Sequence, residues 1–131
     1  MLTGVAGSSR YFVGGIISYD DRVKEGLLGV NPQYLAEYGA VSHQVAKQMA
    51  AGVRQGLNTN WGLSITGIAG PGGGTDAKPV GLVYVGLAGP DGDPESFEYR
   101  FGDARTRDWI RHLSSCTALD RLRRKLLLGK A

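Results

Sequence analysis

The stretch TGIAGPGGGTDAKP, residues 66–79, constrains the fold most strongly, because neither a helix nor a strand tolerates its composition. Five glycines and two prolines fall within it, shortly after the apolar run WGLSI. The stretch therefore predicts a long loop at the end of a buried strand, where α/β folds place ligand sites. Glycine-rich backbone can converge its amides on an anion or a carbonyl oxygen. A wide turn between two strands is the alternative interpretation.

Two familiar phosphate-binding loops are excluded by the residues around this stretch. No Gly-Lys-Ser or Gly-Lys-Thr follows it, so it is not a Walker A loop, and GPGGGT does not open a recognisable helix, as a dinucleotide-binding loop would. The ligand of the loop is therefore left open by composition alone.

Apolar periodicity and turn residues predict the elements on both sides of the loop. We expect strands at 10–19, 62–69, 80–88 and 96–101, and helices at 20–30, 43–57 and 104–128. Ser42 is expected to cap the second helix and Gly129 to end the third. The inward face of the third helix is expected to comprise Trp109, Ile110, Leu113, Leu122 and Leu126. This order predicts a single α/β domain, a three-layer α/β/α sandwich with a mixed sheet, over residues 1–131.

Charge and cysteine usage narrow the function classes. The net charge of +3 does not by itself indicate a nucleic-acid partner, and no apolar run is long enough for a membrane span. The single cysteine, Cys116, excludes an internal disulfide and fits a cytoplasmic location; we expect it to be buried on the last helix. With two histidines and one cysteine, we expect no metal site and no cofactor.

Ser9, Tyr19 and Lys24 form a candidate catalytic group around the first predicted strand. A serine and a lysine can carry out acyl transfer if the lysine is neutral and accepts a proton, and a tyrosine hydroxyl can relay that proton. From spacing alone, the alternative is a turn serine and a solvated lysine. Arg105, Arg107 and Arg111 cluster at the start of the last helix, where they suit a phosphate or a solvated face.

Three stretches taken together are more specific than any one of them. They are GSSRYFVGGIISYDDRVKEGLLGV (7–30), YGAVSHQVAKQMAAGVR (38–54) and SITGIAGPGGGTDAKPVGLVYVGLA (64–88). Together they resemble the CinA C-terminal domain family, whose characterised members are nicotinamide mononucleotide deamidases. The resemblance implies hydrolysis of the carboxamide of nicotinamide mononucleotide to nicotinate mononucleotide and ammonia. A non-catalytic CinA-like module, with a binding role or a role linked to competence and DNA damage, is the alternative.

The resemblance also implies roles for particular residues. Ser9 would attack the amide carbonyl, Lys24 and Tyr19 would deliver the proton to ammonia, and water would hydrolyse the acyl-enzyme. Loop amides would stabilise the oxyanion, and Arg107 would hold the 5′-phosphate. The substrate-binding residues implied in this way are Thr66, Gly67, Gly70, Gly72, Gly73, Gly74, Thr75 and Arg107.

Family members carry a strand and a helix with the motif Glu-Ser-Cys-Thr-Gly-Gly before the segment that matches GSS, so this chain is expected to be truncated at its N-terminus relative to them. An apolar sheet edge should then be exposed, which favours association into a homo-oligomer. The serine of that upstream motif is a second candidate nucleophile. The expected partners are the small-molecule substrate and further copies of the chain, and neither nucleic acid nor a membrane.

Overall fold

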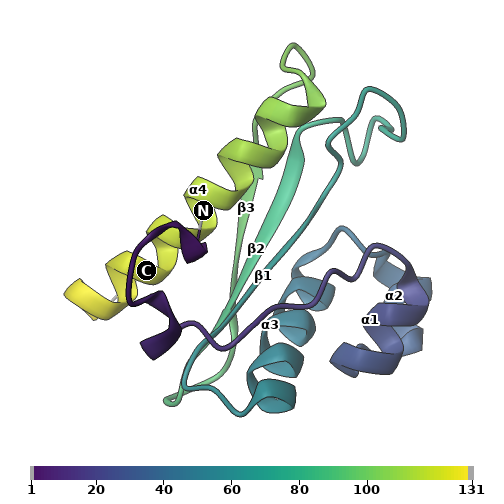
Figure 1. Ribbon diagram of the computed structural model, residues 1–131. Helices are drawn as coiled ribbons and strands as arrows, with labels where there is room; N and C mark the ends of the chain where they lie inside the picture. The colour runs from purple at the N-terminus through teal and green to yellow at the C-terminus, as the bar shows by residue number, and fades with distance from the viewer. Residues whose placement is uncertain (1, 130–131) are drawn as a thin grey trace.

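The computed structural model describes residues 2–129 and consists of a three-stranded antiparallel sheet between two layers of helices (Figure 1). The strands β1 (Gly62–Gly67), β2 (Leu82–Ala88) and β3 (Glu95–Arg100) lie in the order β1-β2-β3. The α-helices are α1 (Asp21–Leu28), α2 (Pro32–Tyr38), α3 (His43–Leu57) and α4 (Arg107–Leu128), and two 3₁₀ turns, Leu2–Gly4 and Ser8–Arg10, precede them. The expected single α/β domain with three layers is confirmed.

Helix α3 covers one face of the sheet, with α1 and α2 packed against it, and α4 lies on the other face (Figure 1). The Ser42 hydroxyl accepts from the Val45 amide at 3.3 Å, which confirms the predicted cap of α3. Val45 and Met49 are buried on its inner side. A Cβ atom at Gly86 of β2 would overlap the Ala46 carbonyl oxygen, so glycine is needed where α3 approaches the sheet.

Strand directions differ from the expected mixed sheet, because β1 pairs antiparallel with β2 and β2 with β3. The predicted strand at 10–19 does not join the sheet. Residues 12–19 lie outside any helix or strand, although their side chains alternate between exposed and half-buried as in a strand. Val13 and Ile17 are 66% and 93% exposed, whereas Ile16 packs against the apolar cluster beneath α1. A strand needs a hydrogen-bonded neighbour, and no described residues provide one here.

Two helices differ from the sequence expectation. Helix α2 was not predicted: Pro32 begins it at a position where a proline needs no amide partner, and Asn31 caps it. In α4 the most buried residues are Ile110, Ser114 and Ala118, spaced four apart. Trp109 and Leu126, predicted to face inward, are 46% and 57% exposed. Trp109 lies to the side of that stripe, and Leu126 lies beyond it, in the exposed C-terminal part of the helix.

Cys116 of α4 is exposed, which contradicts the expected burial, since it also lies off the inner stripe of this helix. Across residues 2–129, none of the helices is both long and apolar enough to cross a membrane.

Candidate active site

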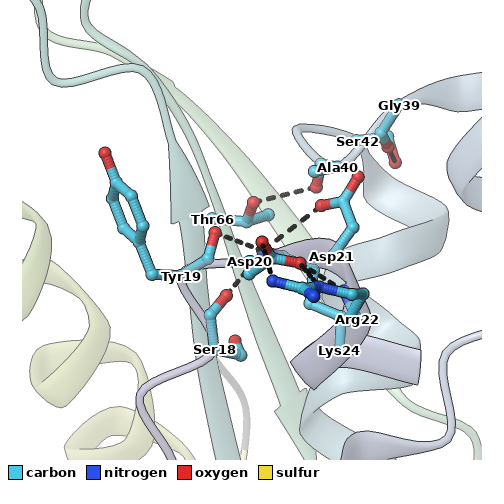
Figure 2. Close-up of polar contacts among 10 residues, drawn as sticks. All are labelled: Ser18, Tyr19, Asp20, Asp21, Arg22, Lys24, Gly39, Ala40, Ser42 and Thr66. Atoms are coloured by element: carbon cyan, nitrogen blue, oxygen red, sulfur yellow. Dashed lines mark hydrogen bonds and ion pairs between the residues drawn. The ribbon is translucent and has the colours of Figure 1, made fainter. Parts of the chain in front are cut away.

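A groove of about 1510 Å³ runs between β1, α4 and the extended segment 12–19. Its walls are mostly apolar: β1 contributes Leu63 and Ile65, and α4 contributes Ile110 and Leu122. Polar side chains among the lining include Ser18, Tyr19, Lys24 and Thr66, which lie near one another (Figure 2); we call this part of the groove, with Gly67, its polar end. This end lies where β1 finishes and the glycine-rich stretch begins, so the groove joins two of the sequence-predicted groups.

Lys24 is held in this polar end by the first turn of α1 (Figure 2). Lys24 is only 6% exposed, and its Nζ donates to the Ser18 carbonyl oxygen at 2.6 Å. The Tyr19 carbonyl oxygen lies 3.5 Å from the same Nζ, and a carboxylate oxygen of Asp21 lies at 3.6 Å. A lysine buried beside two backbone carbonyls is positioned by its surroundings, unlike the solvated helix lysine of the alternative interpretation.

The helix that carries Lys24 begins at a well-formed cap. The Asp20 carboxylate accepts from the Arg22 amide at 2.8 Å and from the Arg22 guanidinium. The hydrogen bond from the Arg22 side chain, followed by that from its amide, lowers the pKa of Asp20 from its ordinary value. Asp20 therefore stays ionised as the cap that fixes where α1, and with it Lys24, starts.

Tyr19 adjoins Lys24 through its backbone rather than through its hydroxyl. Its side chain is 85% exposed, and Figure 2 shows the ring directed away from the Lys24 ammonium. The predicted neighbourhood of the two residues is therefore present, but the structure shows no hydroxyl contact between them.

Ser9 is not brought to the other two members of the predicted catalytic group. It is exposed in the 3₁₀ turn Ser8–Arg10, and the extended segment 12–19 lies between it and Lys24. In Figure 1 this segment runs across the molecule from beside α4 to the start of α1. At ~3.3 Å per extended residue, Ser9 and Lys24 are separated by on the order of 20 Å.

The predicted substrate-binding residues at the end of β1 adjoin the Lys24 end of the groove. Thr66 is 7% exposed, and its hydroxyl donates to the Ala40 carbonyl oxygen at 2.8 Å, which leaves its lone pairs free to accept (Figure 2). Gly67 lines the groove beside it. The glycine loop, defined here as residues 68–81, then leaves the sheet.

The glycine loop is paired at its base and near its tip. Two backbone hydrogen bonds close its base. The Ile68 amide donates to the Leu82 carbonyl oxygen at 2.9 Å, and the Gly81 amide donates to the Ile68 carbonyl oxygen at 2.7 Å. At the tip, the Thr75 amide donates to the Lys78 carbonyl oxygen, and the Lys78 amide donates to the Thr75 hydroxyl. Within residues 2–129, no backbone amide from Ala69 to Gly74 has a protein partner, so these amides are free for a ligand.

Individual glycines of the loop meet different steric limits. A side chain on Gly70 or Gly74 would press on Val80, and both Gly70 and Gly73 have positive φ angles, 77° and 87°. Gly72 faces open space. Composition predicted the loop correctly, and Val80 explains why two of its glycines cannot be replaced freely.

Arg107, which was predicted to bind the substrate phosphate, forms a hydrogen bond with the backbone of the glycine loop. Its Nη1 donates to the Gly70 carbonyl oxygen at 2.9 Å. Arg111, one turn further along α4, lines the groove and lies 3.6 Å from an Asp108 carboxylate oxygen. Of the arginine cluster, Arg111 therefore adjoins the groove, while Arg107 contacts the loop.

Two site residues were missed by sequence reasoning. Asp21 lies beside Lys24, and Lys78 donates through its Nζ to the Tyr38 carbonyl oxygen at the end of α2. Asp21 was visible as a carboxylate three residues before Lys24, a spacing that brings side chains together on a helix. Lys78 had no comparable local signal, because its partner is 40 residues away.

Comparisons with known proteins identify the family of the chain. The family model of the CinA C-terminal domain matches residues 1–126. The CinA-like protein of Cyanothece sp. (strain PCC 7425) is 70% identical over 127 residues, covering 97% of this chain and 30% of the relative. That of Gloeothece citriformis is 66% identical over 128 residues, covering 98% and 31%. The chain thus spans about a third of the length of these curated relatives.

Solved structures show the same fold. The competence/damage inducible protein CihA from Agrobacterium tumefaciens superposes with a TM-score of 0.89 at 42% identity, covering 92% of this chain and 73% of that one. The competence damage-inducible protein A from Klebsiella pneumoniae gives a TM-score of 0.88 at 26% identity, covering 95% and 76%. With a family model matched over nearly the whole chain and these similarities in sequence and structure, the chain belongs to the CinA C-terminal domain family.

Proposed function

We propose that this chain hydrolyses the carboxamide of nicotinamide mononucleotide, giving nicotinate mononucleotide and ammonia. The observation that carries the proposal is the buried Lys24 ammonium in a groove that Thr66, Gly67 and Ala69, at the start of the glycine loop, also line. Membership of the CinA family supports it, because the characterised deamidases that the sequence resembles belong there. The apolar groove walls suit a flat pyridine ring.

Each part of the site has a role in this proposal. Lys24 transfers a proton between the attacking group and the departing ammonia. The free amides between Ala69 and Gly74 stabilise the oxyanion that forms on the amide carbonyl. The lone pairs of the Thr66 hydroxyl accept a hydrogen bond from the amide nitrogen of the substrate. Arg107 as the phosphate residue stays a prediction, and Arg111 is a second cation at the groove.

The direct test is ammonia release from nicotinamide mononucleotide, measured together with nicotinate mononucleotide by chromatography. Nicotinamide riboside, which lacks the phosphate, and free nicotinamide should be compared at equal concentration. The proposal expects stoichiometric release of both products from the mononucleotide. Binding without release would favour the non-catalytic module, for which the separation of Ser9 from Lys24 is the supporting observation.

The Ser9→Ala variant tests the acyl-enzyme route implied by the family resemblance. Because Ser9 and Lys24 lie on the order of 20 Å apart along extended backbone, we expect Ser9→Ala to keep ammonia release within about twofold of wild type. Such a result would move the nucleophile role to another hydroxyl of the chain or to water, and the serine of the upstream family motif would be a candidate only in a protein that carries that motif. A thousandfold loss would instead support Ser9, and mixing the Ser9→Ala and Lys24→Met variants would then show whether Ser9 acts across two copies.

A homo-oligomer is the second part of the proposal. The side chains of Val13 and Ile17 are exposed and line the apolar groove. A continuous exposed apolar surface favours association between copies of the chain. We expect light scattering at micromolar concentration to give a mass of at least two chains. A Val13→Ser, Ile17→Ser double variant should shift that mass toward a single chain. A monodisperse single chain for the wild type would contradict this expectation.

A further inference from the structure

We propose that Arg107 and Lys78 are positioning residues that hold the glycine loop in place where it leaves the groove at Gly67 and Ala69. The two side chains form hydrogen bonds at different positions along the glycine loop. Arg107 reaches the loop from the first turn of α4, and Lys78 ties the loop to the end of α2. Their partners are 37 and 40 residues away in sequence, so each bond fixes a contact that the chain would not make locally.

The Arg107 contact lies at the start of the unpaired part of the loop. Its Nη1 donates to the Gly70 carbonyl oxygen at 2.9 Å, in a half-buried position. A hydrogen bond from a charged donor is stronger than one between neutral groups, and more so away from solvent. The bond orients the Gly70–Pro71 peptide and therefore sets the direction in which the following amides point.

The Lys78 contact lies at the other end of the unpaired part. Its Nζ donates to the Tyr38 carbonyl oxygen, the last of α2, where a cation is favoured by the helix dipole. A Cβ atom at Gly39 would lie only 2.8 Å from this Nζ, so the glycine makes room for the ammonium. Lys78 also closes the loop tip through its backbone bonds to Thr75.

Between these two points the loop has little support of its own. Residues 71–77 are exposed, and within the described chain no backbone amide from Ala69 to Gly74 has a protein partner. Apart from the close approach of Gly70 and Gly74 to Val80, the position of these amides thus depends on the bonds made by Arg107 and Lys78. Arg107 thus has a role that is independent of the substrate phosphate, and this role rests on the proposed function.

The first experiment measures loop release without using activity. Asp76 lies in the exposed part of the loop, so endoproteinase Asp-N can cut between Thr75 and Asp76, and mass spectrometry identifies that cut. For Arg107→Met and Lys78→Met we expect the rate of this cut to rise about tenfold, as expected for losing one charge-assisted hydrogen bond. The rates at the other aspartates should stay unchanged. Arg107→Lys and Lys78→Arg should restore much of the protection.

Matched controls remove a cation of the same type that contacts neither point. Arg105→Met and Lys47→Met replace exposed residues and should leave the cut at Asp76 at the wild-type rate. Unchanged cleavage in both Arg107→Met and Lys78→Met would overturn the proposal. So would faster cleavage at all aspartates alike, because that pattern reports global unfolding.

The second experiment separates positioning from phosphate binding. For Arg107→Met we expect kcat/KM to fall about tenfold for nicotinamide mononucleotide and equally for nicotinamide riboside, because both need the loop amides. A fall confined to the mononucleotide would show that Arg107 contacts the phosphate and would overturn the positioning role. If wild type turned over neither compound, the proposed function would fail, while the Asp76 cleavage would still decide whether the two cations hold the loop.

Discussion

Replacing Lys24 with methionine is expected to lower kcat for ammonia release from nicotinamide mononucleotide by about a thousandfold, the range typical of a lost general acid or base. Methionine matches the length of the lysine stem and keeps its apolar packing, but it cannot donate to the Ser18 carbonyl oxygen or transfer a proton. Substrate affinity should change little, because the groove walls and the glycine loop remain. Turnover and a binding isotherm measured on the same preparation would separate the two effects.

The matched control is Lys47→Met on α3, which removes an exposed lysine. It should keep wild-type turnover, and both variants should unfold cooperatively on heating. Near wild-type ammonia release by Lys24→Met would remove this residue from the chemistry. A Lys24→Met protein that loses substrate binding as well as turnover would point to collapse of the polar end of the groove instead.

Gly52→Ala is expected to destabilise the protein by about 3 kcal/mol, the upper part of the range for overpacking a buried contact. A Cβ atom at this position of α3 would overlap the Leu28 carbonyl oxygen at the end of α1. Backbone cannot rotate aside as a side chain can, so α1 must move away from α3. Because α1 carries Lys24, the same displacement should also reduce turnover. A melting temperature lower by roughly 10 °C would correspond to this loss.

Gly56→Ala supplies a control on the same helix, four residues further on. Nothing lies within 4 Å of a Cβ at that position, so alanine adds helix propensity without a clash. We expect it to stabilise the protein by roughly 0.5 to 1 kcal/mol. The opposite signs of two Gly→Ala changes on one helix would identify the α1–α3 contact as the cause. Equal melting temperatures for Gly52→Ala and wild type would contradict the close approach.

Elements defined by local signals were predicted well from the sequence. Helix α3 covers the predicted residues because its start depends on the Ser42 hydroxyl and its inner face on Val45 and Met49, all within the helix itself. The end of α4 at Gly129, with a φ of 70°, is equally local. The glycine-rich stretch was predicted to be a loop for the same reason, since its residues exclude other structures regardless of their neighbours.

Expectations that depend on distant partners were less successful. Residues 12–19 have the composition and alternation of a strand, but a strand exists only when a neighbour completes its hydrogen bonds. The inner face of α4 depends on where the sheet lies, and Trp109 was therefore assigned to the wrong side. The spacing of Ser9 and Lys24 did not reveal their separation in space, because extended backbone lies between them.

In the candidate site, too, features with a local signal were predicted and contacts between distant residues were not. The loop, Thr66 and Lys24 were identified from the sequence and line or border one groove. The bonds from Arg107 to Gly70 and from Lys78 to Tyr38 span 37 and 40 residues, which no local pattern reports. Arg107 was predicted to bind the substrate phosphate, whereas in the structure it donates to the backbone of the glycine loop.

The order of the strands in the sheet, β1-β2-β3, is also their order along the chain. Each pairing therefore closes only the connection between consecutive strands, residues 68–81 or 89–94, and the entropy lost on closing such connections is small. Sheets built from sequence neighbours have low contact order, which accompanies rapid folding. The wall that carries Thr66 and the glycine loop is thus encoded in one continuous stretch, and its strand pairing can begin before the N-terminal residues 2–41 have taken their places.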